Sequence, residues 1–456
     1  MSDAPVTGPG AAGHTAGRIT TDLVAATQKF PPIAWHAAFG FCQMLIVVFF
    51  SCIAMYCIEG YGIFGANNVV NWGNDIASYI FWIAVAVAGT LVSSILFLFR
   101  QKWRNAVNRS TEAMTVFAIN IAGIYPLIHT GRPWVDYWLI PLPWSQLDLW
   151  PQFKSPIMWD VFAITGYATC SVLFFYLGLL PDLATLRDRS KHWLQKLIYG
   201  ALCLGWKGTA SDWRHYERAY SQFAWIATPL VIGMHSTIAT LLAVSTLPGW
   251  HATIFPPYFV SGAIYGGLAM AMVIVVPMRS LLKLEAYITI DHLERLAKIM
   301  IAVGCIVGYV YCTEAFTAWY SESSYERGQF LYRATGPHAW AFWIMVCCNL
   351  LPVTLLLLFR PLRRSLGFLF LVGLVVNVGM WFERYVIVAL SLEHDWLPSS
   401  WYLYSFTAWD YLILAGSFGL FFTQFLVFSR VAPVVSIAEI KTVILPRPGH
   451  GKGGHD

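Results

Sequence analysis

The chain has 456 residues, of which 57% are hydrophobic and only 12% are charged. Its mean hydropathy of +0.58 excludes an ordinary soluble globular protein, in which about a quarter of the residues carry charge. The net charge of +5 lies mostly in the connections between apolar segments, so it indicates membrane topology and gives no reason to expect nucleic-acid binding.

The first 34 residues are rich in Gly, Ala, Thr and Pro and lack the pattern of a secretory signal, so we expect a disordered tail ahead of an uncleaved first helix. The Gly-rich segment 446–456 should be equally unstructured. Between them, apolar runs long enough to cross about 30 Å of hydrocarbon must be helices, because lipid cannot satisfy their backbone groups. These runs lie near residues 35–58, 76–99, 112–129, 157–180, 220–245, 253–277, 298–320, 338–359, 366–391 and 401–429.

The predicted fold is an all-α integral membrane protein with about ten transmembrane helices, arranged as two four-helix bundles plus flanking helices. A weak internal echo supports the two bundles: 81–83 and 342–344 both read Phe-Trp-Ile, and each run ends in Phe-Arg. A parallel duplication would explain this echo, and so would chance similarity between apolar helices.

Lys and Arg gather in alternate connections, near residues 100–109, 187–218, 279–298 and 360–364. Because such residues are retained on the cytoplasmic side, both termini are predicted to be cytoplasmic. The segment around 193–198 has the pattern of an amphipathic helix on that membrane surface. On the opposite side, the 129–156 loop should form an ordered flap anchored by its aromatic rings. Its tryptophans are Trp134, Trp138, Trp144, Trp150 and, at the start of the next helix, Trp159.

Ionisable side chains within the spans are costly, and here they gather toward the outer, periplasmic ends of the helices. They are Asp160, His235, Glu314, Glu383, Arg384 and Asp410, with His129 at the same depth. For several of them a structural role is an alternative. Arg384 could form a buried ion pair with Glu383 or Glu314 that fixes helix packing. His235 could be a hydrogen-bonded histidine of the bundle, and Asp410 could contact the lipid headgroups. The inner halves offer few buried carboxylates, so the sequence shows no complete polar path across the membrane.

His129 and Asp160 are the best candidates for chemistry. Asp160 shares a helical face with Tyr167, seven residues later, and His129 begins the segment His129-Thr130-Gly131-Arg132-Pro133-Trp134. A quinol suits such a pocket, because its oxidation releases two protons that a nearby imidazole or carboxylate can accept. The predicted quinol-binding set is His129, Thr130, Gly131, Arg132, Asp160 and Tyr167, with His129 and Asp160 catalytic. A second, proton-conducting set is predicted to contain His235, Tyr311, Glu314, Glu383, Arg384 and Asp410.

No metal-binding pattern accompanies these residues. The nine cysteines lack Cys-x-x-Cys spacing, and no two of the twelve histidines share a predicted span at haem-ligand spacing. We therefore expect no haem or iron–sulfur cluster in this chain, so the electrons must leave to a partner.

Three segments resemble the NrfD-type membrane subunits of polysulfide reductases. They are the His129–Trp134 motif, Ser155-Pro156-Ile157-Met158-Trp159-Asp160, and Gly178-Leu179-Leu180-Pro181-Asp182-Leu183-Ala184 followed by Arg187-Asp188. The similarity covers about residues 30–430 and is strongest to the larger quinol-binding membrane subunit of bacterial alternative complex III. The first and last spans and the segment 181–218 depart from smaller relatives.

The resemblance implies oxidation of menaquinol or a related quinol near the periplasmic face of a bacterial inner membrane, with His129 and Asp160 at quinol-site positions. The implied partners are a periplasmic iron–sulfur subunit, a c-type haem subunit, a second NrfD-like membrane subunit and a terminal oxidase, beside membrane lipids. The expected organisation is a cytoplasmic tail (1–34), a bundle with the quinol site (35–245), a bundle with a proton path (246–430) and a cytoplasmic tail (431–456).

Three alternatives stay open. Some members of the family reduce quinone, and pocket residues do not fix the direction of electron flow. A secondary transporter would also place ionisable residues among its helices, although nearer the midplane. A non-catalytic membrane anchor would need neither His129 nor Asp160.

Overall fold

The computed structural model describes residues 15–139, 154 and 156–444. Within these residues every regular element is a helix, and ten helices are long and apolar enough to cross a membrane. The fold class predicted from the sequence is therefore confirmed, and the chain is an all-α, multi-pass membrane protein.

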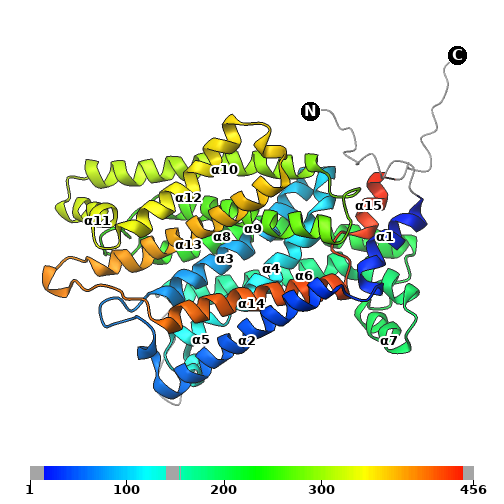
Figure 1. The fold of residues 1–456 in the computed structure, drawn as a ribbon, viewed down its shortest axis with the longest axis horizontal. Helices are drawn as coiled ribbons and strands as arrows, with labels where there is room; N and C mark the ends of the chain where they lie inside the picture. Colours follow the sequence, from blue (N-terminus) through cyan, green and yellow to red (C-terminus); the bar gives the residue numbers. More distant parts are fainter. Residues whose placement is uncertain (1–14, 140–153, 155, 445–456) are drawn as a thin grey trace.

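Most of the spans form two four-helix bundles, each a ring in which every helix packs against two neighbours. The first bundle consists of α3 (Asn74–Leu98), α4 (Asn108–Ala122), α6 (Pro156–Arg189) and α8 (Ala210–Ala243). The second consists of α9 (Phe255–Leu281), α10 (Ile290–Tyr320), α12 (Ala339–Leu358) and α13 (Leu366–Glu393). The two flanking spans, α2 (Ile33–Glu59) and α14 (Ala408–Val431), lie side by side (Figure 1).

The two bundles meet along α3 and α9. In the most apolar stretches of these helices 83% and 89% of the residues are buried, against 22% in α2. A helix that is apolar on all sides is typical of the centre of a membrane bundle. The contact is close, because a Cβ added at Gly267 would lie 1.9 Å from the Cβ of Ala88.

The flanking pair is equally close. A Cβ added at Gly416 of α14 would lie 2.5 Å from the Cβ of Phe49 of α2, and one at Gly419 would lie 2.4 Å from the Cβ of Leu45. Small residues at such positions let transmembrane helices pack backbone to backbone. Thus α14, which follows the second bundle in the sequence, packs against α2 and α4 beside the first.

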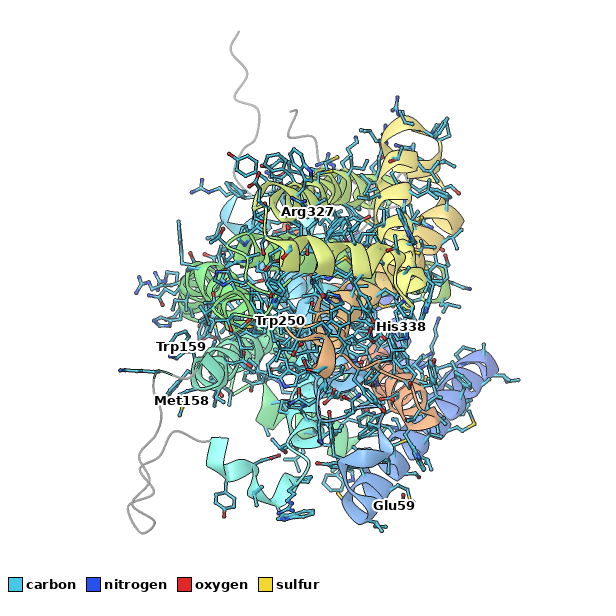
Figure 2. The ribbon with its side chains drawn as sticks, turned by 90° about the vertical axis from the view of Figure 1, so that its left-hand side faces the viewer. Glu59, Met158, Trp159, Trp250, Arg327 and His338 are labelled. Atoms are coloured by element: carbon cyan, nitrogen blue, oxygen red, sulfur yellow. The ribbon has the colours of Figure 1, made fainter. Side chains whose placement is uncertain are left out.

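Short helices mark the two ends of the molecule. At the end that we call the terminal end lie α1 (Ala16–Gln28), α7 (Trp193–Leu202) and α15 (Ile437–Ile444), at the right of Figure 1. At the other, which we call the site end, lie α5 (Tyr125–His129), α11 (Ser324–Thr335) and the 60–73 and 394–407 connections. Figure 2 looks onto the site end and shows Trp250 between Trp159 and His338.

The N-terminal segment differs from the prediction, because α1 replaces part of the expected disordered tail. Its first turn is capped by Thr15, whose side chain accepts a hydrogen bond from the Arg18 amide. Ile19, Leu23 and Val24 fall on one face and are buried, where α1 packs against α14 and α15. Only a few apolar residues form this face, so the overall composition of the segment gave no indication of a helix. The predicted unstructured segment 446–456 lies outside the described residues.

The helices also extend further at the terminal end than the apolar runs predicted. α4 begins at Asn108, α6 ends at Arg189 and α8 begins at Ala210. These extensions carry charged residues, which made them resemble loops in the sequence. At the site end, α4 stops at Ala122 and the chain restarts as α5, which has Pro126 in its first turn.

The predicted amphipathic helix is α7, none of whose residues is buried. Trp193, Leu194, Leu197 and Ile198 are exposed on one face. An apolar face of this kind is typical of a helix that lies in the membrane interface.

Candidate functional site

His129 and Asp160 line the same cavity, of about 490 Å³, near the site end of the first bundle. Its walls come from the four elements α3, α4–α5, α6 and α8, and most of them are apolar. The lining residues are Trp72, Ile76, Tyr79, Ile80, Gly123, Pro126, His129, Thr130, Asp160, Val161, Ile164, Thr165, Ile238, Leu241 and Leu242. A largely apolar pocket with a few convergent polar groups is the usual form of a small-molecule site.

His129 is held by a carboxylate from another helix. Its Nδ1 lies 2.7 Å from Oδ2 of Asp75, which stands in the first turn of α3, where the helix dipole favours a negative charge. A carboxylate can only accept a hydrogen bond, so Nδ1 carries the donated proton and Nε2 is left as the basic nitrogen. The break between α4 and α5 places this ring at the cavity.

Asp75 has a second donor, the hydroxyl of Tyr61, at 2.7 Å. Burial, followed by the nearby charge of Asp75, raises the pKa of Tyr61 far above its usual value, so this phenol stays protonated and keeps donating. Asp75 was not predicted as a site residue. An acidic residue in the first turn of a membrane span was the signal that could have identified it.

Asp160 presents one free oxygen. Its Oδ2 accepts a hydrogen bond of 2.9 Å from the hydroxyl of Tyr79, whereas Oδ1 is buried and has no hydrogen-bond partner among the described residues. A buried acceptor without a donor is unfavourable unless a ligand or water supplies one. The cavity therefore joins a basic imidazole nitrogen and an unsatisfied carboxylate oxygen.

Of the other predicted quinol-site residues, some line the cavity and some do not. Thr130 lines the cavity. Gly131 has a φ of 76°, which favours glycine, and turns the chain away, so that Arg132 is exposed. Tyr167 does not line the cavity but is buried deeper in the bundle, beside Thr90 and Ser171.

Of the tryptophans in the predicted aromatic flap, the side chains of Trp134 and Trp159 are described, and both are exposed. This exposure fits rings that anchor a loop at a membrane interface. Trp144 and Trp150 lie outside the described residues.

The second predicted cluster is only partly assembled. Glu383 pairs with its neighbour Arg384, Nη1 to Oε1 at 2.5 Å, and accepts a hydrogen bond from the hydroxyl of Tyr311. The Arg384 guanidinium lies 4.7 Å from the centre of the Phe259 ring, and His235 packs against the same ring. Both nitrogens of His235 are buried without a hydrogen-bond partner among the described residues.

Among the described residues, neither Glu314 nor Asp410 forms a hydrogen bond or ion pair with Glu383 or Arg384. Glu314 pairs with Arg333 at 2.6 Å and lines a separate cavity of about 360 Å³. Asp410 accepts hydrogen bonds from the amides of Thr407 and Gly65 and from the hydroxyl of Tyr404. These bonds cap α14 and hold the loops around it, and the proton-path role of Asp410 stays a prediction.

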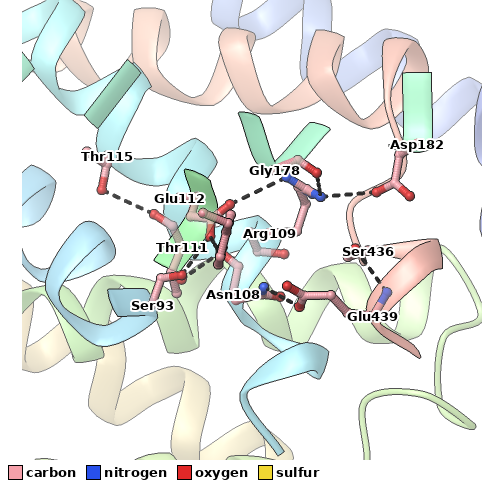
Figure 3. A network of polar contacts seen from close by, with 12 residues as sticks. Ser93, Asn108, Arg109, Thr111, Glu112, Thr115, Gly178, Asp182, Ser436 and Glu439 are labelled. Atoms are coloured by element: carbon pink, nitrogen blue, oxygen red, sulfur yellow. Dashed lines mark hydrogen bonds and ion pairs between the residues drawn. The ribbon is translucent and has the colours of Figure 1, made fainter. Parts of the chain in front are cut away.

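Near the terminal end the first bundle contains a buried charged network that the sequence analysis missed. Figure 3 shows Arg109 between Glu112, the carbonyl of Gly178 and Asp182. Its Nη2 lies 2.6 Å from the Gly178 oxygen and 3.1 Å from Asp182 Oδ2, and its Nη1 lies 3.4 Å from Glu112 Oε2. The expectation of few buried carboxylates in the inner halves is thus wrong. The helix extensions bring these groups inside the bundle.

Further hydrogen bonds extend this network in both directions along the bundle. Glu112 also accepts hydrogen bonds from Ser93, at 2.6 Å, and Tyr220, at 2.8 Å. On the side of the network toward the terminal end, Glu439 of α15 accepts hydrogen bonds from Arg104 and Asn108 at 2.8 and 2.7 Å. Pairing of this kind offsets the desolvation of the buried charges.

Between this network and the cavity lies a smaller set of hydroxyl groups. The hydroxyl of Thr90 is 3.2 Å from that of Thr115 and 3.1 Å from that of Ser171. Tyr167, with a buried hydroxyl that has no partner among the described residues, lies beside them. The first bundle thus contains polar groups from the terminal end to the cavity.

Comparison with known proteins agrees with this architecture. The family model described as polysulphide reductase, NrfD, matches residues 62–393, well over half of the chain. A putative membrane subunit of a dimethyl sulfoxide reductase from Halobacterium salinarum is 23% identical over 239 residues, 52% of this chain and 50% of that protein, so the chain aligns with about half the length of that relative. A selenate reductase subunit from Mesobacillus selenatarsenatis is 22% identical over 394 residues, 82% of this chain and 89% of that protein.

The chain belongs to the NrfD family.

Proposed function

We propose that this chain is the quinol-oxidising membrane subunit of a respiratory quinol:electron-acceptor oxidoreductase of the alternative complex III type. The strongest support is the shared cavity, in which His129 and Asp160 meet between apolar walls. The names of the two relatives refer to subunits of reductases, which favours a redox complex over a transporter.

The arrangement suits the chemistry of a quinol. Removing two electrons from a quinol also releases the protons of its two hydroxyl groups. In the proposed reaction, His129 Nε2 accepts one proton and the free Oδ1 of Asp160 accepts the other, while Asp75 stabilises the imidazolium that forms. The apolar walls hold the ring and the start of the prenyl tail.

The electrons and the location follow the same proposal. The electrons pass to the iron–sulfur cluster of a periplasmic partner, then to a c-type haem subunit and a terminal oxidase, and a second NrfD-like protein shares the membrane. The terminal end carries many basic residues, so we place it in the cytoplasm of a bacterial cell and the site end at the periplasmic face of the inner membrane. Menaquinol is the expected substrate.

Quinol oxidation by the purified complex tests this function. His129→Ala and Asp160→Asn should each lower the rate roughly 100-fold, the usual effect of losing a positioned proton acceptor. His36→Gln and Asp188→Asn, at exposed sites outside the cavity, are matched controls and should keep the parental rate. Full activity in both cavity variants would favour a membrane anchor, and uptake of a solute by the isolated chain in liposomes would favour a transporter.

We also propose that quinol oxidation is coupled to proton translocation. Its support is the set of polar groups in the first bundle, from Asp182 and Glu112 through Thr90 to the cavity, together with the Glu383 cluster in the second. Glu112→Gln and Glu383→Gln should lower the number of protons moved per electron more than the rate of quinol oxidation. Unchanged proton stoichiometry at full turnover would make both clusters structural.

A further inference from the structure

A second cavity, of about 370 Å³, lies between the bundles and α14 and shares no lining residue with the cavity of His129. Its walls come from α3, α9, α12, α13 and α14, and they include the rings of Trp340, Trp381 and Phe418. Among its lining residues there is no His, Asp, Glu, Lys or Arg. This cavity therefore cannot take the protons of a quinol, and its chemistry differs from that of the first.

The cavity opens sideways into the membrane. Leu374 and Val378 of α13 and Tyr411 of α14 line it and are 41%, 47% and 59% exposed. These residues stand on membrane-spanning helices, so what faces them is the hydrocarbon of the bilayer. A ligand must therefore arrive from the membrane, with an apolar body that suits the aromatic walls.

One polar group in this cavity is unsatisfied. The amide nitrogen of Asn377 donates to the carbonyl of Gly373 at 2.6 Å, which fixes the orientation of the amide. Its oxygen Oδ1 is buried and has no hydrogen-bond partner among the described residues. An acceptor without a donor is costly in hydrocarbon, so a fitting ligand brings a hydroxyl or an N–H group.

The depth of Asn377 decides between membrane ligands. It lies roughly 16 Å along α13 from Leu366 and roughly 24 Å from Glu393, at 1.5 Å per residue, which is well inside the bilayer. A phospholipid keeps its polar headgroup at the surface, so only its acyl chain could reach this level. A quinol is apolar enough to enter the hydrocarbon and carries hydroxyl donors, whereas the oxidised quinone carries only acceptors.

We propose that this cavity is a second quinol site, which holds the reduced carrier without reacting with it. Asn377 accepts a hydrogen bond from a quinol hydroxyl, and the aromatic walls contact the ring. Because a quinone lacks the donor, the site prefers the reduced form and serves as a reservoir for the reacting cavity. The identity of the ligand rests on the proposed function.

Photolabelling distinguishes the two sites. The complex is reconstituted in lipid nanodiscs with a menaquinol that carries a photoreactive benzophenone, kept reduced with dithionite, and the labelled peptides are identified by mass spectrometry. We expect label in the α5–α6 region and also in α13 and α14. The oxidised analogue should label α13 and α14 at least roughly fivefold less, because a buried acceptor then stays unpaired.

Two variants test the second site. Val378→Trp should block the mouth and remove the α13–α14 label while keeping the α5–α6 label. Leu371→Trp, an exposed position of the same helix outside the cavity, is the matched control and should keep both. Asn377→Leu should abolish the preference for the reduced form, a result that does not depend on blocking the site.

The outcomes separate this inference from the function. Absence of label at α5–α6 alone would contradict the proposed function. Absence of label at α13–α14, or equal labelling by both redox forms, would overturn the second site and leave the function standing. A phospholipid that is retained by the parent complex and lost in Val378→Trp, seen by native mass spectrometry, would also overturn it by showing that an acyl chain fills the cavity.

Discussion

At the scale of single residues, the candidate site depends on pairs that are distant in sequence. His129 and Asp75 are 54 positions apart, and Asp160 and Tyr79 are 81 positions apart. The motif around position 129 and the cost of an acid in a membrane span were enough to select His129 and Asp160. Nothing in a single sequence pairs them with Asp75 or Tyr79, because those contacts exist only after the helices pack.

Asp75 is the residue whose role is most open to test. Asp75→Asn should keep the ring of His129 in place, since an amide oxygen still accepts from Nδ1, but it removes the charge that stabilises the imidazolium. We expect kcat for quinol oxidation to fall roughly 10- to 100-fold with little change in KM, as for loss of a carboxylate that orients a functional histidine. Tyr61→Phe removes a hydroxyl that donates to Asp75 and to the carbonyl of Asn71 but leaves the charge of Asp75, so it is the control and should have a smaller effect. A kcat of Asp75→Asn equal to that of the parent would show that Asp75 only stabilises the fold.

Arg109 is the residue on which stability depends most. Its side chain is 2% exposed and that of each acid beside it is 1% exposed, so Arg109→Met leaves two buried carboxylates unpaired. The expected loss is about 3–5 kcal/mol, measured as a lower Tm in detergent.

Two further variants check the origin of that loss. The triple variant Arg109→Met/Glu112→Gln/Asp182→Asn removes every charge and should recover part of the lost stability. Lys298→Met, on a side chain that is 55% exposed, should leave Tm unchanged. If the triple variant were less stable than Arg109→Met, the network would owe its stability to packing and not to charge pairing.

At the scale of elements, the existence of all ten spans could be predicted from apolar runs, but their ends could not. α4 begins four residues before its predicted run, and α6 and α8 each continue for about two and a half turns or more beyond theirs. The predicted loop residues Arg109, in α4, and Asp182, in α6, therefore stand within helices and are buried. Charge in a sequence indicates a membrane boundary only where it faces water. Here Arg109 and Asp182 pair with each other inside the bundle, so their charges do not mark the end of a helix.

The crossing of α3 and α9 gives a prediction at this scale. Gly267→Ala would place a methyl group 1.9 Å from the Cβ of Ala88, which forces the bundles apart. We expect a loss of about 1–3 kcal/mol, as for other overpacked contacts, seen as a lower Tm. Gly233→Ala on α8, where an added Cβ meets nothing within 4 Å, should cause no loss. Equal Tm values for the two variants would show that the interface between the bundles is loosely packed.

At the scale of the whole molecule, the two bundles and the flanking helices were predicted, whereas the pairing of α2 with α14 was not. Gly416 and Gly419 fit against Phe49 and Leu45 across more than 360 positions of sequence. The sequence of an apolar helix gives little indication of which helix it packs against. The contact is therefore visible only in three dimensions.

The orientation of the molecule in the membrane can be tested directly. Lys283 lies in the connection after α9 at the terminal end, and Glu322 lies between α10 and α11 at the site end. In intact cells a membrane-impermeant maleimide should label Glu322→Cys and should label Lys283→Cys only after permeabilisation, with the parent chain as the control for native thiols. The reverse pattern would place the quinol cavity on the cytoplasmic side.

The pairing of α2 with α14 has a consequence for how the protein is made. Helix α2 leaves the ribosome before every other described span and α14 after all of them. The face of α2 that packs against Gly416 and Gly419 is therefore uncovered in the lipid until α14 has been made. A nascent chain that stops before residue 408 leaves that face open to other proteins. Membrane quality control thus has a surface by which to recognise a chain that lacks α14.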